Sequence, residues 1–247
     1  MNSFLHLMSP NLLPILASKV NFQHPMVWGV IIGWIMTVVL HEFAHGIVAW
    51  WGGDYTIKER GGLTLNPFQY IDPVFSIILP IIFLAMGGIP LPGGVTYVRR
   101  DLLRNRYWCS AVSLAGPMMN FLIFLLCVIA IHPKVGWVDY ALEVVDWSTA
   151  QQFCATMAFL QIYAVLLNLF PIPPLDGFGA ISPFLPHDLR NTLSSPQVAN
   201  VLFIGYFLAL QNYRPLGDAF IRIIVHVLLL LGIDPLIVLD GYNQMFK

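Results

Sequence analysis

The chain alternates long apolar runs with short polar ones. Residues 26–51, 107–131 and 150–170 are almost entirely apolar over 26, 25 and 21 positions. At a rise of about 1.5 Å per residue, helices of this length cross the hydrocarbon core of a bilayer. Residues 196–211 and 216–232 form two shorter apolar runs. The pattern therefore predicts about five transmembrane helices.

The connection between the first two spans has a different pattern. Residues 55–57 and 62–65 are short runs with β-branched side chains around a turn at 58–61, and 94–98 is a similar run. Such runs beside turn residues predict short strands. Strand backbone at a bilayer needs protein or a water-filled cavity to satisfy it. We therefore expect a small membrane-associated β-hairpin here, whose edge could pair with an extended peptide.

Residues 71–89 are apolar but interrupted by Pro73, Pro80 and the pair Gly87–Gly88. We expect this segment to be re-entrant, leaving the membrane on the side where it entered. Residues 1–25 lack the basic start of a signal peptide and are expected to form an uncleaved interfacial segment. The predicted fold class is thus an all-α polytopic membrane protein with about five transmembrane helices, a re-entrant segment and a small membrane-associated β-hairpin.

Composition supports a membrane location. The chain is 57% hydrophobic and 10% charged, with a net charge of −1. Soluble domains carry about 25% charged residues. The high hydrophobic content excludes a disordered chain, and the net charge near zero excludes a nucleic-acid binder, which needs a basic face. Three cysteines (Cys109, Cys127 and Cys154) are far apart in sequence and form no CxxC motif, so we interpret them as packing residues.

Only three ionisable residues lie inside the three longest apolar runs. They are His41, Glu42 and His45, and they form the sequence HEFAH, an HExxH motif. Residues four apart share a helix face, so both imidazoles can reach one metal ion, with the glutamate roughly 100° away around the helix. The alternative is a pair of hydrogen-bonded histidines in a helix bundle. It leaves a glutamate unexplained in an apolar span.

A catalytic zinc ion takes three protein ligands and keeps one position open. Asp176 is the candidate for the third ligand, because prolines end the preceding helix and Gly177 permits a tight turn beside it. The alternative is an ordinary surface turn. The other histidines are less well placed, in loops, in tails or on the polar side of a tilted helix: His6, His24, His132, His187 and His226.

Three motifs together resemble the site-2 protease family, which consists of intramembrane zinc metalloproteases. They are HEFAH at 41–45, SLAGPMMN at 113–120 and NLFPIPPLDG at 168–177. The resemblance covers roughly residues 26–180. The motifs GLTLNP at 62–67 and IDP at 71–73 make it similar to the compact prokaryotic subgroup without a PDZ domain.

The resemblance implies one zinc ion per chain, held by His41, His45 and Asp176, with Glu42 as the catalytic base. It implies that Asn168 contacts the substrate or the developing oxyanion. The implied function is regulated intramembrane proteolysis, in which a zinc-dependent endopeptidase hydrolyses a peptide bond in or next to a transmembrane helix of a protein substrate. Residues 26–180 would be the catalytic core and 181–247 a set of C-terminal helices.

The sequence departs from the subgroup pattern at two places. Tyr70 stands where the subgroup commonly has histidine, and residues 89–92 read IPLP instead of Lys-Pro-Val-Pro. Neither departure touches the implied metal ligands, but both could alter how the substrate is handled.

The zinc ligands must meet at one membrane depth, which excludes a full crossing by 71–89 and requires a course that is re-entrant or lies along the interface. The distribution of basic residues supports the same course, since basic residues favour the cytoplasmic side of a membrane. Under this course the exit side of the first span carries eight: Lys58, Arg60, Arg99, Arg100, Arg104, Arg106, Arg190 and Lys247. The other side carries three: Lys19, Lys134 and Arg214. We therefore expect a multi-pass protein of the cell membrane with its active site near the cytoplasmic side.

Two other classes of function stay open on the sequence. One is a pseudoprotease that binds client helices without cutting them, and the other is a haem protein with axial histidines. The expected partners are the lipid bilayer and a protein substrate with a transmembrane helix, and no nucleic acid. Gly29 and Gly33 fit close helix packing but do not establish an oligomeric state.

Overall fold

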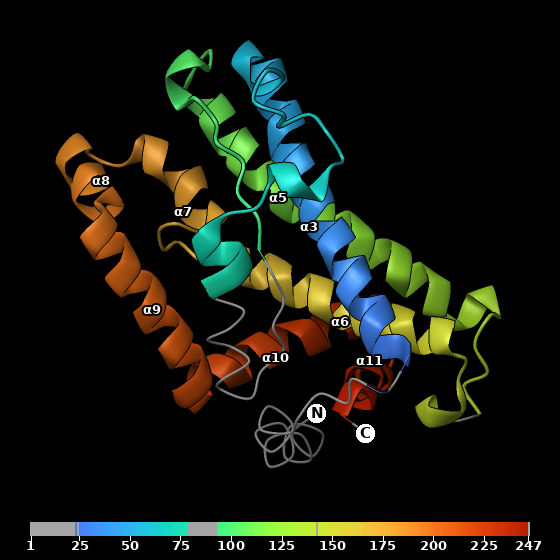
Figure 1. The fold of residues 1–247 in the computed structure, drawn as a ribbon. Helices are drawn as coiled ribbons and strands as arrows, with labels where there is room; N and C mark the ends of the chain where they lie inside the picture. The colour runs from blue at the N-terminus through green and yellow to red at the C-terminus, as the bar shows by residue number, and fades with distance from the viewer. Residues whose placement is uncertain (1–22, 24, 79–92, 142, 247) are drawn as a thin grey trace.

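Three long helices form the centre of the molecule: α3 (Pro25–Gly52), α5 (Arg106–Ile131) and α6 (Thr149–Asn168). The structure is a computed structural model that describes residues 23, 25–78, 93–141 and 143–246. The three helices pack against one another and correspond to the three longest apolar runs of the sequence (Figure 1). The expected interfacial segment at 1–25 lies almost entirely outside the described residues.

Local sequence fixes where these helices begin and end. Asn105 caps α5, accepting hydrogen bonds from two backbone N–H groups of its first turn. Ser148 and Gln151 form a reciprocal capping box at the start of α6. At the end of α3, Gly53 has a φ of 119°, a backbone conformation that glycine adopts at little cost.

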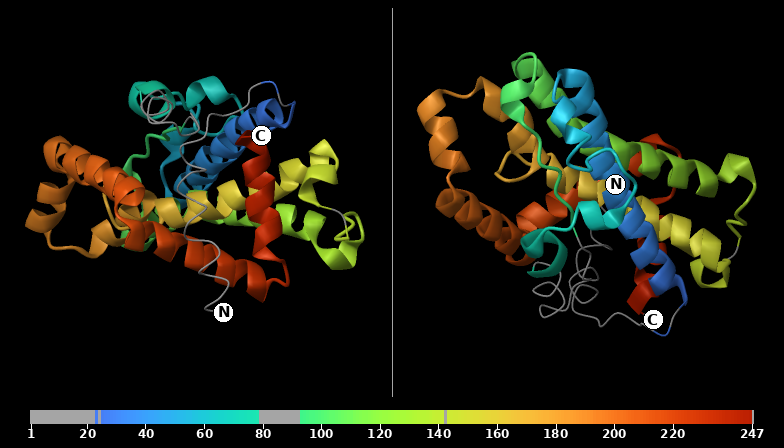
Figure 2. Two further views of the ribbon diagram at one scale, coloured as in Figure 1. Left: turned by 90° about the horizontal axis from the view of Figure 1, so that it is seen from below. Right: turned by 45° about the horizontal axis from the view of Figure 1, so that its top comes forward.

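Five further helices follow α6. They are α7 (Asp176–Ile181), α8 (His187–Ser194), α9 (Pro196–Asn212), α10 (Arg214–Leu230) and α11 (Pro235–Asn243). Single turns of 3-10 helix link the longer elements: η1 (Tyr55–Ile57), η2 (Pro67–Gln69), η4 (Arg100–Leu102), η5 (Pro133–Val135), η6 (Val144–Asp146), η7 (Ser182–Phe184) and η8 (Gln244–Phe246). One π-helical segment is η3 (Pro73–Ile78). Figure 2 shows that α8 and α9 stand to one side of the central helices.

The main apolar core lies between the central helices and the last two helices of the chain. Its fully buried members include Phe124, Met157 and Leu228. Gly33 of α3 faces the ring of Phe153 on α6, where a Cβ atom would lie 2.9 Å from the ring. The glycine therefore serves packing within the chain, between α3 and α6.

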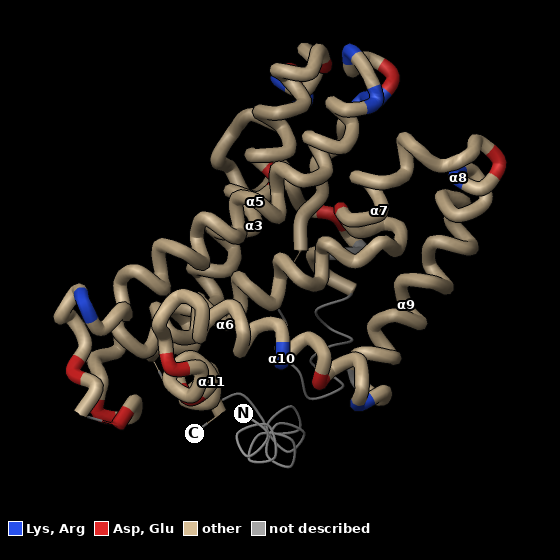
Figure 3. The backbone as a smooth tube through the Cα atoms, turned by 180° about the vertical axis from the view of Figure 1, so that it is seen from behind, with Lys and Arg blue, Asp and Glu red and all other residues tan. Residues whose placement is uncertain are grey.

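Three described helices are long and apolar enough to cross a membrane, namely α3, α5 and α6. Helices α8 and α9 would make a fourth span if taken together, although they bend by 68° at the break between them. The described residues therefore provide three or four candidate spans, where the apolar runs predicted about five. Helix α10 has 17 residues and reaches about 26 Å, less than the roughly 30 Å of a bilayer core. Figure 3 shows long uncharged stretches in the central helices, with most charges at helix ends and connections.

The predicted β-hairpin is wrong, because the described residues contain no β-strand. Residues 55–57 form the 3-10 turn η1, 62–65 continue a turn into irregular backbone, and 94–98 are irregular. A strand needs a neighbouring strand to satisfy its backbone, and these runs lie beside side chains instead.

Side chains satisfy the backbone of residues 93–99 at three points: Gly93 O accepts from Ser76 Oγ, Tyr97 O accepts from Arg60, and the Arg99 N–H donates to Asp54. A single backbone bond, from the Val95 N–H to Tyr70 O, connects the segment to residues 67–70. The segment is thus anchored without a ladder of hydrogen bonds.

The end of α3 and the approach to α5 meet at the same end of the helix pair. The N–H of Arg104 donates to Gly52 O at 2.9 Å, and Leu103 and Trp108 pack against Gly52. Residues 53–103 therefore leave and return at one end of the pair. The re-entrant course expected for 71–89 falls mostly outside the described residues.

Candidate metal centre

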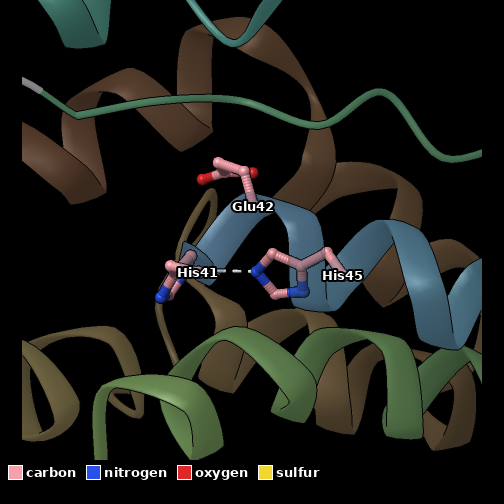
Figure 4. Close-up of side chains that lie close together, drawn as sticks. All are labelled: His41, Glu42 and His45. Atoms are coloured by element: carbon pink, nitrogen blue, oxygen red, sulfur yellow. Dashed lines mark hydrogen bonds between the residues drawn. The ribbon is translucent and has the colours of Figure 1, made fainter. Parts of the chain in front are cut away.

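His41 and His45 lie one turn apart on α3, and both are buried. Their Nε2 atoms are 3.1 Å apart, and the two rings stand edge to face with centroids 4.7 Å apart. Figure 4 shows both imidazoles on the side of α3 that faces α5. The spacing of the motif therefore has the predicted effect, which is to bring two ligand-type nitrogens to one point.

The outer nitrogens of the two rings are held by α5. His41 Nδ1 contacts Asn120 Oδ1 at 3.0 Å, and His45 Nδ1 contacts the carbonyl oxygen of Val112 at 2.6 Å. A carbonyl oxygen only accepts, so the Nδ1–H of His45 is the donor. The Nδ1–H of His41 donates in the same way to Asn120 Oδ1. The Nε2 lone pairs of both rings therefore face inward, as in metal-binding histidines.

Asp176 begins α7 and completes the cluster. Its Oδ2 lies 3.2 Å from His41 Nε2, and its Oδ1 lies 3.4 Å from His45 Nε2. Ligand atoms bound tetrahedrally to zinc at about 2.0–2.1 Å lie roughly 3.3 Å apart. Two inward lone pairs and a carboxylate at this spacing fit zinc. Neither Nε2 atom carries a hydrogen in this arrangement, so the two nitrogens need a cation between them to offset their repulsion.

Two polar contacts hold α7 against α5. Ser110 Oγ donates to Ala180 O at 2.6 Å. The guanidinium of Arg100 donates both to Gly179 O and to Ser113 Oγ. Since α7 has only six residues, these contacts keep its first residue, Asp176, beside the imidazoles.

Glu42 is buried and points away from α5, toward the extended segment that crosses above α3 in Figure 4. The ligand atoms of His41, Glu42 and His45 all lie within 4.8 Å of one another, so Glu42 could also be counted as a ligand. The closer 3.2 and 3.4 Å spacing of Asp176 fits tetrahedral zinc better.

The segment at residues 93–99 covers Glu42. A Cβ atom at Gly94 would lie 3.0 Å from Glu42 Cγ, and Thr96 Oγ1 donates to the backbone carbonyl of Glu42. Tyr70 is also buried here, with its hydroxyl donating to Thr64 O. Burial raises the pKa of Tyr70, and the nearby Glu42 carboxylate adds to the rise against the opposing hydrogen bond to Thr64.

Asn168 ends α6 and is half-buried. None of the hydrogen bonds among the described residues joins its side chain to the other four candidate residues. The turn that follows is tight, since a Cβ atom at Gly177 would lie 2.1 Å from Leu169 O. The structure therefore brings His41, Glu42, His45 and Asp176 together and leaves Asn168 at the neighbouring helix end.

Sequence reasoning missed Gly116, the residue that lets α5 approach the imidazoles. A Cβ atom at this position would lie 2.4 Å from the Nε2 atoms of both histidines. It also missed the role of Asn120, which lies one turn further along α5. A glycine and an asparagine four apart in an apolar span were the available signal, but only the packing of α5 on α3 gives them their partners.

Comparisons with known proteins identify relatives. The chain is 42% identical over 165 residues to "Putative zinc metalloprotease Rip2" of Mycolicibacterium smegmatis, which covers 67% of this chain and 60% of that protein. It is 39% identical over 181 residues to the protein of the same name from Mycobacterium tuberculosis, covering 73% and 66%. The chain thus spans less than two thirds of the length of these relatives.

A third relative is matched over more of its length. The chain is 33% identical over 187 residues to "Putative zinc metalloprotease YwhC" of Bacillus subtilis, covering 74% of this chain and 80% of that protein. No family model and no solved structure matches the chain. Extensive similarity to these relatives, together with the HExxH helix, shows that the chain belongs to the site-2 protease family of zinc metalloproteases.

Proposed function

We propose that the chain is a zinc-dependent intramembrane endopeptidase, which hydrolyses a peptide bond in or next to a transmembrane helix of a protein substrate in regulated intramembrane proteolysis. One observation carries this proposal. The HExxH motif lies on a helix apolar enough to span a membrane, and Asp176 brings a third donor within 3.4 Å of its imidazoles.

His41, His45 and Asp176 would hold the zinc ion, one per chain. Zinc bound there would supply Lewis acidity that polarises the scissile carbonyl and activates water. Asn120 and the Val112 carbonyl keep the two imidazoles turned inward. The three ligands come from α3 and α7, and α5 packs against both of these helices.

Glu42 would act as the general base. It accepts a proton from the attacking water and delivers it to the leaving amine. Its buried position beside Gly94 and next to His41 and His45 supports this role, because the carboxylate lies within reach of the cluster and is covered by residues 93–99. Asn168 would contact the substrate or the developing oxyanion from the end of α6.

The depth of the cluster supports a substrate within the membrane. His45 and His41 precede the end of α3 by 7 and 11 residues, or roughly 10 and 16 Å along the helix axis. A peptide bond must reach this depth, and a helical substrate must first open its i to i+4 hydrogen bonds to expose a carbonyl. Lipid and a transmembrane protein substrate are therefore the proposed partners.

The proposed catalytic core is 26–180, which contains all five candidate residues, with 181–247 as C-terminal helices. The proposed location is the cell membrane, with the site near the cytoplasmic side. Six basic residues lie between the end of α3 and the first residue of α5, namely Lys58, Arg60, Arg99, Arg100, Arg104 and Arg106, and one, Lys134, lies in the connection between α5 and α6, which supports this orientation.

The haem alternative fits the geometry poorly. Both Nε2 atoms project from one helix to one point, 3.1 Å apart, and a haem ring has no room between them. No comparable observation favours the pseudoprotease.

Glu42→Gln tests the proposed activity. The amide is nearly isosteric but does not accept a proton at neutral pH, so zinc should stay bound while cleavage falls by roughly 10² to 10⁴-fold. The assay uses the full chain in liposomes with single-span helical peptides, and mass spectrometry locates the new chain ends.

The matched control is Glu143→Gln, which removes an exposed carboxylate at the opposite end of the molecule and should cleave normally. Wild-type rates from Glu42→Gln would refute the general-base role. Cleavage confined to the distant polar ends of the peptides, away from the helix, would refute the intramembrane substrate.

A further inference from the structure

A cavity of about 600 Å³ lies beside α7, apart from the metal centre. It is lined by η4, by the start of α5, by α7 and by the α8–α9 pair, and none of the four clustered residues lines it. Figures 1 and 2 show α8 and α9 arching away from α5 on this side. The cavity is large enough for a small polar headgroup but lies outside the proposed reaction site.

Two arginines give the cavity an unbalanced positive charge. Arg100 and Arg190 line it together with a single carboxylate, Asp101. That carboxylate is already paired with Arg99, at 2.6 Å. Among the described residues no carboxylate is ion-paired with Arg100 or Arg190, and guanidinium groups stay charged at all working pH values. Among the described residues, the two arginines of the lining therefore have no ion-paired carboxylate to balance their charge.

The remaining polar lining suits a phosphate group. Ser182, Asn191 and Ser194 add hydroxyl and amide donors around the arginines. Ala199, in the first turn of α9, also faces the cavity, so the positive end of that helix dipole is nearby. Planar guanidinium groups with neighbouring hydroxyls are typical of sites that bind phosphate oxygens.

Helix α9 also presents an apolar surface on its outer side. Val201, Ile204 and Leu208 on α9 are exposed by 71%, 57% and 49%. Their spacing of three and four residues puts them on one helix face. Ala199, which lines the cavity, lies on the opposite side of α9, so this helix separates the cationic cavity from an outer apolar surface that acyl chains could cover.

We propose that this cavity binds the phosphate of an anionic phospholipid, at a place where α9 presents its outer apolar face to the surrounding lipid. The position is consistent with a membrane surface, because the cavity lies where α5 and α9 begin. Arg100 also donates to Gly179 O, so a bound headgroup contacts the residue that holds α7 and Asp176. The inference does not depend on proteolysis.

Native mass spectrometry of the delipidated full chain in detergent tests the proposal. The probes are phosphatidylglycerol, phosphatidylcholine and inorganic phosphate. Wild type should bind phosphatidylglycerol more tightly than phosphatidylcholine. Arg190→Gln should weaken phosphatidylglycerol binding about tenfold, the effect of losing one charge-assisted hydrogen bond. Arg190→Lys, which keeps the charge, should retain most of the binding and guards against a folding defect.

Lys58→Gln is the matched control, because it removes an exposed positive charge at the same end of the molecule but outside the cavity. It should bind phosphatidylglycerol as wild type does. Equal binding by Arg190→Gln and wild type would overturn the proposal, as would equal affinity of wild type for the two lipids. Inorganic phosphate that displaces phosphatidylglycerol at equal concentration would also overturn it, because the site would then serve a free anion.

Discussion

Gly116 sets the closest approach of α5 to the two imidazoles. Helix periodicity and the cost of charge in a membrane single out the HExxH motif, whereas the prediction of Asp176 rests on the proline break before Gly177 and on the family resemblance. The groups on α5 that orient the two imidazoles could not be predicted from the sequence. Which face of α5 meets the outer ring nitrogens depends on how α5 packs, and the glycine and asparagine four residues apart in its sequence do not reveal their partners.

Gly116→Ala should abolish zinc binding. The added methyl group would lie 2.4 Å from both Nε2 atoms, so the imidazoles or α5 must move. Alanine favours helix over glycine by about 1 kcal/mol, so the helix itself should not suffer. Zinc per chain and the far-UV circular dichroism spectrum measure the two effects.

Gly205→Ala provides the control for this substitution. It makes the same change in α9, where nothing lies within 4 Å of the added carbon, and it should bind zinc normally. A Gly116→Ala protein with wild-type zinc content would contradict the described packing of α5 on the metal centre.

At the scale of elements, Asp54 ties the segment above Glu42 to the end of α3. Its fully buried carboxylate accepts from Thr56 Oγ1, from Arg60 and from the backbone N–H of Arg99. Burial opposes ionisation, but these hydrogen bonds and the Arg60 charge outweigh it and lower the pKa of Asp54. The β-hairpin prediction failed here because β-branched residues favour extended backbone without specifying its partner.

Asp54→Asn should loosen residues 93–99, because the amide replaces one acceptor oxygen by a donor facing donors. We expect faster tryptic cleavage at Arg99 and lower thermal stability at neutral pH. The stability gap should narrow below about pH 4, since a lowered pKa contributes stability that is lost as the pH falls. Asp101→Asn, which breaks only an exposed pair, should change the melting temperature little. Equal melting temperatures of Asp54→Asn and wild type would contradict this account.

For the molecule as a whole, the hydrogen bond from Arg104 to Gly52 defines the topology of the first two spans. Composition and apolar runs predicted a membrane protein with about five spans, and the described residues contain three helices long enough to span, or four with the bent α8–α9 pair. Residues 196–211 and 216–232 form helices that are short for a bilayer, and α9 continues from α8 only through a sharp bend.

Single cysteines at positions 58 and 104 should be labelled by impermeant reagents from the same side of the membrane, and one at 134 from the other. Helix α5 separates positions 104 and 134, whereas 58 and 104 lie at one end of the α3–α5 pair. The background replaces Cys109, Cys127 and Cys154 and must still cleave. Labelling of 58 and 104 from opposite faces would rule out this topology.

Zinc stoichiometry of the purified full chain tests the proposed centre most directly. The three-ligand site predicts one zinc per chain in wild type, in Glu42→Gln and in Asp188→Ala, which removes an exposed carboxylate on α8. It predicts loss of zinc in Asp176→Ala, because one of three protein ligands is gone. The opposite pattern, in which Asp176→Ala keeps its zinc while Glu42→Gln loses it, would contradict the account and make Glu42 the third ligand.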